Sequence, residues 1–406
     1  MPKPLPYHLA IRDLLRDLDP HVWNWFGRQR LEPAALEALK FDLLKSTYRL
    51  SRVSHAAIYH AADAVADALQ VKLPITLYQS QTDSVPNAGI AFASEEIHIV
   101  LRGKIDSVLN EAELKALFGH EFGHHLLHRA ENGEHLQAWD ALRATCLDSN
   151  VHPAFLHSFR KLCLYSEIFC DRVAFEVVRD LDTVVSMLVK VTLGATTVMA
   201  ADFIVQAKEI LRRFDTNNES SSEGLTHPEA YIRACAIELY HQESPSHESE
   251  IAKWIEGAMG MATLDLLQQR EVSVATRQLI RQILRFSHIQ SDLMLSHARL
   301  YFEDFSWDEC LNTADEKLTK LIADQPNTNS IISYFCFVLL DFATADRELE
   351  ELPLANALMI SEKLGLKEPL IPMARKEMKL RKNQIDQWDR TKHHILESTH
   401  ASKRAP

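Results

Sequence analysis

Residues 109–125 read LNEAELKALFGHEFGHH, and this stretch indicates both the fold and the chemistry of the chain. Asn110 is typical of a helix N-cap, and Glu113 three residues later completes a capping box. The pattern therefore predicts a helix over residues 111–129.

Two histidines in this helix form the pattern HExxH. His120 and His124 are one turn apart, so both imidazoles can reach one metal ion. The carboxylate of Glu121 can accept a proton from a water on that ion. Gly119 and Gly123 weaken a helix, so they predict the close approach of another backbone. The alternative is that the histidines are only surface or packed residues of a helix, and these features count against it.

The third ligand distinguishes the classes of HExxH site. A metzincin has His at the position occupied here by Ala130. His125 points off the ligand face, and His128 is about 12 Å of helical rise from His120, too far to share one ion. We expect both to be solvated or structural.

A second helix, predicted over residues 153–178, supplies a better candidate. Its segment 165–174 reads YSEIFCDRVA and carries Glu167 and, one turn later, Asp171 in a largely apolar context. Glu167 can bind the metal, and Asp171 can accept the other N–H of a zinc histidine. The alternative is a solvated acidic face.

Composition narrows the class of protein. The 406 residues are 46% hydrophobic and 25% charged, which indicates a soluble globular chain. A net charge of −12 argues against a nucleic-acid partner. The six cysteines form no CxxC pair, which favours free thiols in a reducing compartment, and we expect a cytoplasmic location.

The chain shows no sequence typical of a signal peptide or a membrane span. Its most hydrophobic window, Thr183–Ala201, contains Lys190, which is costly in a membrane. We expect a buried helix there, and a membrane-contacting segment is the alternative.

Periodicity predicts an α+β, mostly helical fold: a zincin-like domain with a small sheet, residues 1–255, followed by an all-α region, residues 256–406. The expected elements before the HExxH helix are helices 5–18 and 33–70 and strands 73–78, 90–93 and 96–101. Polar breaks are expected at 215–224, 243–250 and 324–329.

The sequence resembles the M48 peptidases over about residues 40–240. Residues 86–106, PNAGIAFASEEIHIVLRGKID, resemble the family's Asn-Ala turn and edge strand, and residues 109–125 its capped HExxH helix. Glu167 and Asp171 match its ExxxD, and residues 226–233, THPEAYIR, its Thr-His-Pro segment. The resemblance implies a gluzincin fold, zinc and proteolysis.

The resemblance also implies roles for residues outside the ligand set. His227 or Arg233 would stabilise the oxyanion, and strand 96–101 would be an edge strand that pairs with an extended substrate. The implied substrate-binding residues are Asn87, Ile97 and Ile99. Phe122 and Cys170 depart from the family's commoner residues, and neither is expected to touch the ligand set. The absence of the membrane helices of well-known members puts a prenylated or membrane-protein substrate in doubt.

The sequence of the all-α region does not indicate a single role. Residues 338–366 weakly resemble TerB-like domains, but Glu348, Glu350 and Glu351 are more simply a solvated helix face. A regulatory, substrate-recruiting or oligomerising role remains open, and so does the oligomeric state.

The leading hypothesis is a zinc endopeptidase that acts on peptides or unfolded segments. The alternatives are a metal-stabilised scaffold or chaperone, a latent protease held off by its helical region, and a repressor-cleaving regulatory metallopeptidase.

Overall fold

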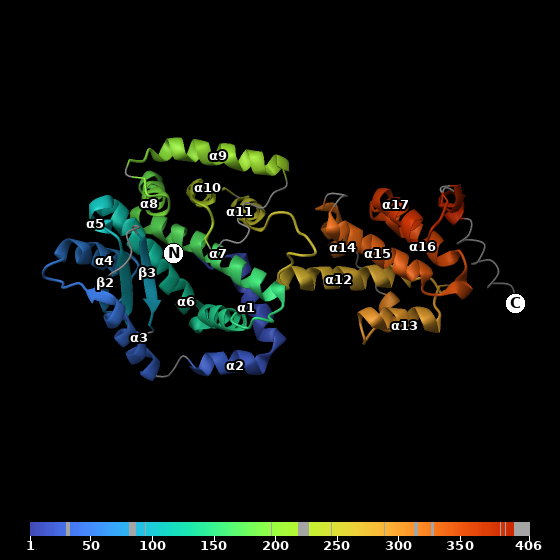
Figure 1. Cartoon of the computed structure of the whole chain (residues 1–406), viewed down its shortest axis with the longest axis horizontal. Coiled ribbons are helices and arrows are strands. Elements are labelled where there is room, and N and C mark those ends of the chain that lie inside the picture. Colours follow the sequence, from blue (N-terminus) through green and yellow to red (C-terminus); the bar gives the residue numbers. More distant parts are fainter. Residues whose placement is uncertain are drawn as a thin grey trace. The chain divides into compact units, whose positions relative to one another are not determined.

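The computed structural model divides into two compact units, Met1–Ala258 and Met259–Pro406 (Figure 1). The described residues are 1–29, 33–80, 87–93, 95–195, 197–217, 227–244, 246–287, 289–311, 316–325, 329–381, 383–385 and 387–393. Much of the breaks expected at 215–224 and 324–329 lies outside these ranges.

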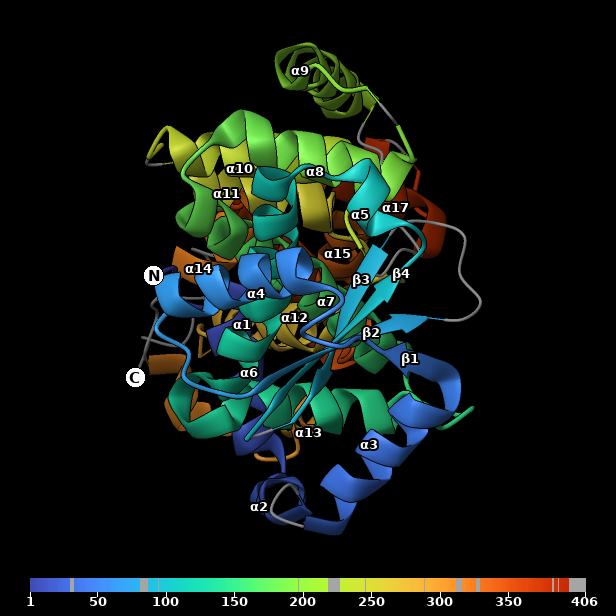
Figure 2. The same ribbon diagram turned by 90° about the vertical axis from the view of Figure 1, so that its left-hand side faces the viewer.

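A four-stranded mixed sheet lies in the first unit. Its strands are β1 (Thr47–Arg49), β2 (Ile75–Ser80), β3 (Asn87–Phe92) and β4 (Ile97–Arg102), in the order β1-β2-β4-β3. β2 and β4 are parallel, and the two outer pairings are antiparallel (Figure 2). The other regular elements of the described chain are helices, so the predicted α+β, mostly helical fold is confirmed.

The prediction that residues 96–101 form an edge strand is wrong. β4 lies between β2 and β3, and its Ile97 and Ile99 are fully buried. The outer strand on this side is β3, which begins at Asn87. Alternation along one strand reports which side chains are buried but not which neighbours the strand acquires.

The single helix expected over residues 33–70 is also wrong. The chain forms α3 (Pro33–Ser46), turns into β1, and resumes a helix only at α4 (Ala56–Ala68). Pairing of β1 with β2 satisfies the extended backbone between the helices. Tyr59 of α4 joins the segment after β1 to β2. Its hydroxyl donates to the Leu50 carbonyl and accepts from the Leu77 N–H, both at 3.0 Å.

The two long helices that carry the candidate ligands pack together. α6 is Glu111–Thr145, with non-helical backbone at 130–133, so its first part ends where the sequence predicts. Asn110 and Glu113 form the predicted capping box. α7 is Pro153–Val178, as predicted.

Shorter helices surround this pair: α1 (Pro6–Leu18), α2 (Pro20–Gln29), α5 (Ile105–Val108), α8 (Leu181–Leu193), α9 (Ala200–Asn217), α10 (Ala230–His241) and α11 (His247–Glu256). The apolar window Thr183–Ala201 is not one helix, because Gly194 adopts a φ of +68° and ends α8. α11 begins inside the break expected at 243–250. Across the described ranges, none of the helices has the length and apolarity that crossing a membrane requires.

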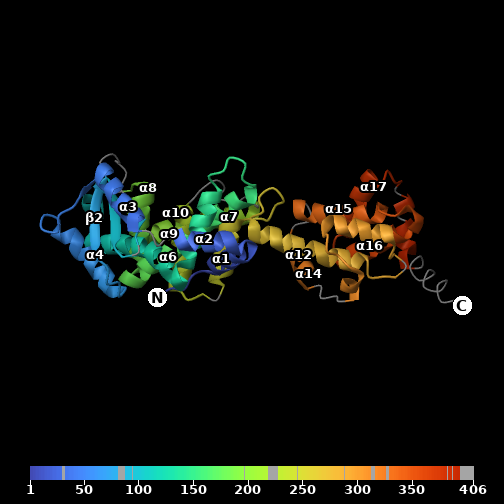
Figure 3. The ribbon, with the colours of Figure 1, turned by 90° about the horizontal axis from the view of Figure 1, so that it is seen from below.

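The second unit is all helical and has its own apolar core. It comprises α12 (Leu266–Ile283), α13 (Asp292–Tyr301), α14 (Glu316–Ala323), α15 (Ser330–Thr344), α16 (Leu352–Lys363) and α17 (Lys367–Glu377), with short 3₁₀ turns at Trp307–Leu311 and Arg347–Leu349 (Figure 3). Glu348, Glu350 and Glu351 are exposed, as the solvated-face interpretation predicts.

Candidate metal centre

The two HExxH histidines project from α6 towards α7. Their ring centroids are 5.1 Å apart and the rings are nearly perpendicular. His120 is buried, whereas the side chain of His124 is 18% exposed, so the pair lies at the edge of the core. Two imidazole nitrogens therefore converge at a place that solvent can reach.

A glycine contact brings α7 close enough to complete the site. A Cβ on Gly119 would lie 2.9 Å from the Ala174 Cα, and one on Gly123 would lie 2.8 Å from the Cys170 Cα. Any side chain at either glycine would push the helices apart. The predicted close approach of a second backbone is confirmed.

Glu167 of α7 faces both histidines. Its two carboxylate oxygens lie 3.4 Å from the Nε2 of His120 and 3.5 Å from the Nε2 of His124. Each carboxylate oxygen thus faces the Nε2 atom of one imidazole, and one ion could bind between these atoms. The structure brings together the three residues that the sequence predicts as ligands.

Asp171 and Arg233 contact His120 and Glu167 and fix their orientation. Asp171 Oδ1 is 2.9 Å from the Nδ1 of His120, which orients the ring and leaves its Nε2 for a ligand bond. Arg233 of α10 donates to both oxygens of Asp171 at 2.6 and 2.7 Å, and its guanidinium lies 3.3 Å from Glu167.

These contacts set the charges at the site. Burial opposes ionisation of Glu167 and Asp171, but Arg233 and His120 outweigh it, and the pKa of both carboxyls is lowered. Burial would lower the pKa of His120, yet Glu167 and the hydrogen bond to Asp171 raise it to about 10. The two carboxylates therefore favour positive charge beside His120.

The residue types fit zinc. Two imidazoles and an ionised carboxylate are the protein ligands of a catalytic His₂Glu zinc site, in which a fourth position stays open. The carboxylate charge that raises the pKa of His120 would also favour a dication at this place. His120, His124 and Glu167 would hold the ion, with Asp171 orienting His120.

The residues predicted as oxyanion donors occupy different places. Arg233 is buried, with its guanidinium engaged by the carboxylates of Glu167 and Asp171. His227 is 67% exposed, and its Nε2 lies 3.6 Å from a Glu167 oxygen. The two candidate donors thus differ in their exposure to solvent, and both lie beside Glu167.

Two further histidines of α6 are not ligands of this centre. His125 is buried, and burial followed by the charge of Arg129 lowers its pKa to about 4. The ring of His128 lies against that of Trp139 in a tilted arrangement, with ring centroids 5.7 Å apart. The structural role expected for these two residues agrees with these contacts.

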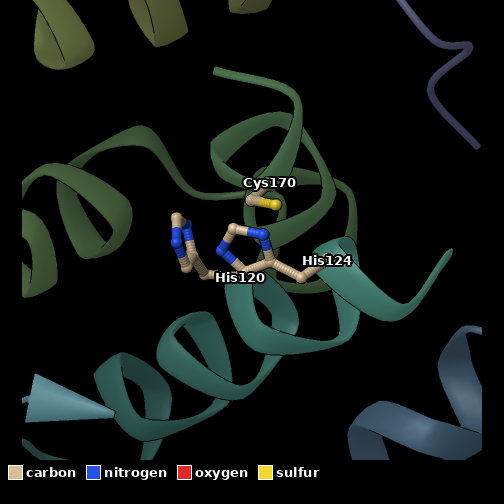
Figure 4. Close-up of side chains that lie close together, drawn as sticks. All are labelled: His120, His124 and Cys170. Carbon is tan, nitrogen blue, oxygen red and sulfur yellow. The ribbon is translucent and has the colours of Figure 1, made fainter. Parts of the chain in front are cut away.

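One prediction about the ligand set is wrong. Cys170, expected to lie clear of the ligands, places its sulfur within 4.8 Å of a ring nitrogen of both His120 and His124 (Figure 4). Glu167 is nonetheless the stronger third ligand, because it is ionised. Burial, followed by the nearby carboxylates, raises the pKa of the Cys170 thiol well above its usual value. The signal in the sequence was the spacing: Cys170 follows Glu167 by three residues, which places both on one helix face.

A helix with HExxH packed against a second helix that supplies a glutamate defines a metallopeptidase-type centre. Residues 54–240 match the model of peptidase family M48, so this region of the chain is identified with that family. The matched region includes β2, β3, β4 and both ligand-bearing helices.

One curated relative is itself described as a metallopeptidase 48. The plastoglobule-localized metallopeptidase 48, chloroplastic, of Arabidopsis thaliana is 24% identical over 233 residues. The match covers 53% of this chain and 65% of the relative, so the chain spans just under two thirds of the relative's length. No solved structure matches this chain.

Proposed function

We propose that this chain is a zinc-dependent endopeptidase that hydrolyses peptide bonds in peptides or unfolded protein segments. The observation that carries the proposal is the convergence of His120 and His124 on the ionised Glu167, with Asp171 fixing the first ring. The match of residues 54–240 to a metallopeptidase family supports it. Zinc bound to these residues would polarise the scissile carbonyl and make a water acidic enough to attack it.

Glu121 is the proposed general base. It follows His120 on α6, is buried, and lies close enough to Cys170 for its charge to contribute to the raised pKa of that thiol. Its carboxylate would take a proton from the attacking water and return it to the leaving nitrogen. A carboxylate on this helix face has no purpose in a metal-stabilised scaffold, so Glu121 favours turnover over that alternative.

The remaining groups would bind and orient the substrate. His227 would donate to the oxyanion, while Arg233 keeps Glu167 and Asp171 ionised and in place. β3 is an outer strand of the sheet and also contacts α6, so it, rather than β4, is the strand proposed to pair with an extended peptide. Of the implied substrate-binding residues, only Asn87 lies on β3.

We also propose a cytoplasmic location and a division into a peptidase domain, residues 1–255, and a helical domain, residues 256–406. All six cysteines are free, which supports a reducing compartment. The boundary between the two compact units, after Ala258, supports the division. A peptide or protein is the proposed partner.

Glu121→Gln tests this function. We expect the purified variant to retain zinc and to lose cleavage of a fluorescently labelled unfolded protein by about 10²-fold or more, the usual contribution of a positioned base. Glu111→Gln is the matched control, because Glu111 lies in the exposed first turn of the same helix and pairs only locally with Lys115. Equal cleavage by the wild type and Glu121→Gln would contradict the proposal.

A further inference from the structure

Cys170 lies near the candidate metal centre and has no role in the proposed mechanism. Its sulfur and one ring nitrogen from each of His120 and His124 lie within 4.8 Å of one another. Figure 4 shows the thiol on α7 directed towards the two imidazoles of α6. Glu167, three residues earlier on the same helix face, reaches the same imidazoles.

The position of the thiol is fixed by backbone packing. A Cβ on Gly123 would lie 2.8 Å from the Cα of Cys170 and 3.1 Å from its sulfur, so α6 and α7 touch at this residue. A small side chain is required there, and alanine would satisfy that requirement. The cysteine adds a soft sulfur donor beside two imidazoles, and sulfur and imidazole nitrogen are both usual zinc ligands.

The surroundings of the thiol are unusual for a cysteine that only packs. It is fully buried, yet the carboxylates of Glu167, Asp171 and Glu121 are all close enough to act on it electrostatically. These carboxylates oppose ionisation of the free thiol, so the sulfur would bind as a thiolate only together with a cation, whose charge would offset theirs.

We propose that Cys170 is a fourth protein ligand of the ion held by His120, His124 and Glu167. A sulfur–metal bond forms, the S–H bond breaks, and the proton passes to solvent without any change of oxidation state. Four protein ligands close a tetrahedral zinc site, whereas a catalytic site keeps one position open. The thiolate-bound form is therefore a latent form that retains its metal. This regulatory part rests on the proposed peptidase function, and the ligation does not.

Cobalt(II) substitution of the full-length chain tests the ligation directly. We expect the wild type to show a thiolate-to-cobalt charge-transfer band in the near ultraviolet, and Cys170→Ala to bind one equivalent of cobalt without that band. Cys163→Ala is the matched control, because Cys163 is another buried thiol of α7 and should leave the band unchanged. A wild-type spectrum identical to that of Cys170→Ala would overturn the proposal.

Zinc affinity gives a second readout. Loss of a ligand should weaken zinc binding by at least about tenfold, since even the loss of a group behind a ligand costs that much. Cys170→Ser keeps the size of the side chain and serves if Cys170→Ala fails to fold. Unchanged affinity in a folded variant would contradict the ligation.

The two proposals fail in different ways. A thiolate band in a protein that never cleaves an unfolded substrate would leave the ligation standing and remove the peptidase function. Cleavage by the wild type without a band would do the reverse. If both hold, Cys170→Ala should cleave at least as fast per bound zinc as the wild type, and slower cleavage would remove the latent form.

Discussion

At the scale of single residues, Asp171 connects the metal centre to the rest of the fold. One oxygen orients His120, and both oxygens receive Arg233. A carboxylate in this position fixes which ring nitrogen of the histidine is protonated and increases the basicity of the other nitrogen. Arg233 offsets the cost of burying that charge, together with the charge of Glu167.

Asp171→Asn should therefore weaken zinc binding without removing any proposed ligand. The amide can still accept from His120 but carries no charge, and we expect the zinc dissociation constant to rise about 10- to 100-fold. Competition with a chromophoric chelator measures it. Asp182→Asn, at an exposed position in the first turn of α8, makes the same charge change and should have no effect. Equal affinities for Asp171→Asn and the wild type would mean that the contact with His120 does not tune the site.

At the scale of elements, the centre depends on how closely α6 and α7 pack. The ligands come from both helices, so the spacing between the helices sets the gap between the imidazoles and Glu167. Gly119 and Gly123 set that spacing, because each meets a backbone atom of α7 where a Cβ would stand.

Gly123→Ala tests this spacing. Alanine favours a helix by about 1 kcal/mol over glycine, but its Cβ would lie 2.8 Å from the Cys170 Cα, and overpacking costs about 1–3 kcal/mol. We expect a lower thermal midpoint and a loss of bound zinc. Gly89→Ala is the control, since nothing lies within 4 Å of the added Cβ. If Gly123→Ala is as stable as the wild type and binds as much zinc, the space between α6 and α7 can accommodate a methyl group at this position.

At the scale of the whole molecule, buried histidines make stability depend on pH. Burial, followed by nearby His135, lowers the pKa of His8, and burial, followed by Arg12, lowers that of His135 to about 4. Both are neutral in the folded protein but protonate in the unfolded chain below about pH 6.5. Their stabilising contribution is present above pH 6.5 and is lost as the pH falls towards 4.

We therefore expect the free energy of unfolding of the metal-free protein to fall between about pH 6.5 and pH 5, measured by urea titration. His120 has the opposite sign, because its pKa is raised to about 10, so its contribution is complete below pH 6.5 and does not mask the change. The fall should be smaller in His135→Gln. An identical pH dependence in the variant and the wild type would exclude His135 as a source.

The second unit should fold without the first. Its buried apolar residues, from Leu264 on the approach to α12 to Ile385 beyond α17, form one cluster within the unit. We expect residues 259–406 expressed alone to give a helical circular dichroism spectrum and a cooperative urea transition. A spectrum without helix, or a transition without cooperativity, would show that this unit depends on the peptidase region.

Much of the centre could be predicted from sequence because its signals are local. The i, i+4 spacing of His120 and His124 follows from helix periodicity, and the capping box at Asn110 gives the start of that helix. Gly119 and Gly123 predicted the close approach of another backbone, which proved to be that of α7. Glu167 and Asp171 stood out as carboxylates one turn apart in an apolar helix.

Only the tertiary structure decided the features that depend on which segments become neighbours. It placed β4 inside the sheet and made β3 the outer strand, it formed β1 within a predicted helix, and it paired Arg233 with the carboxylates of Glu167 and Asp171. It also brought the Cys170 sulfur up to the two imidazoles. Local spacing determines the face on which a side chain lies, whereas the group that meets that face is determined by long-range packing.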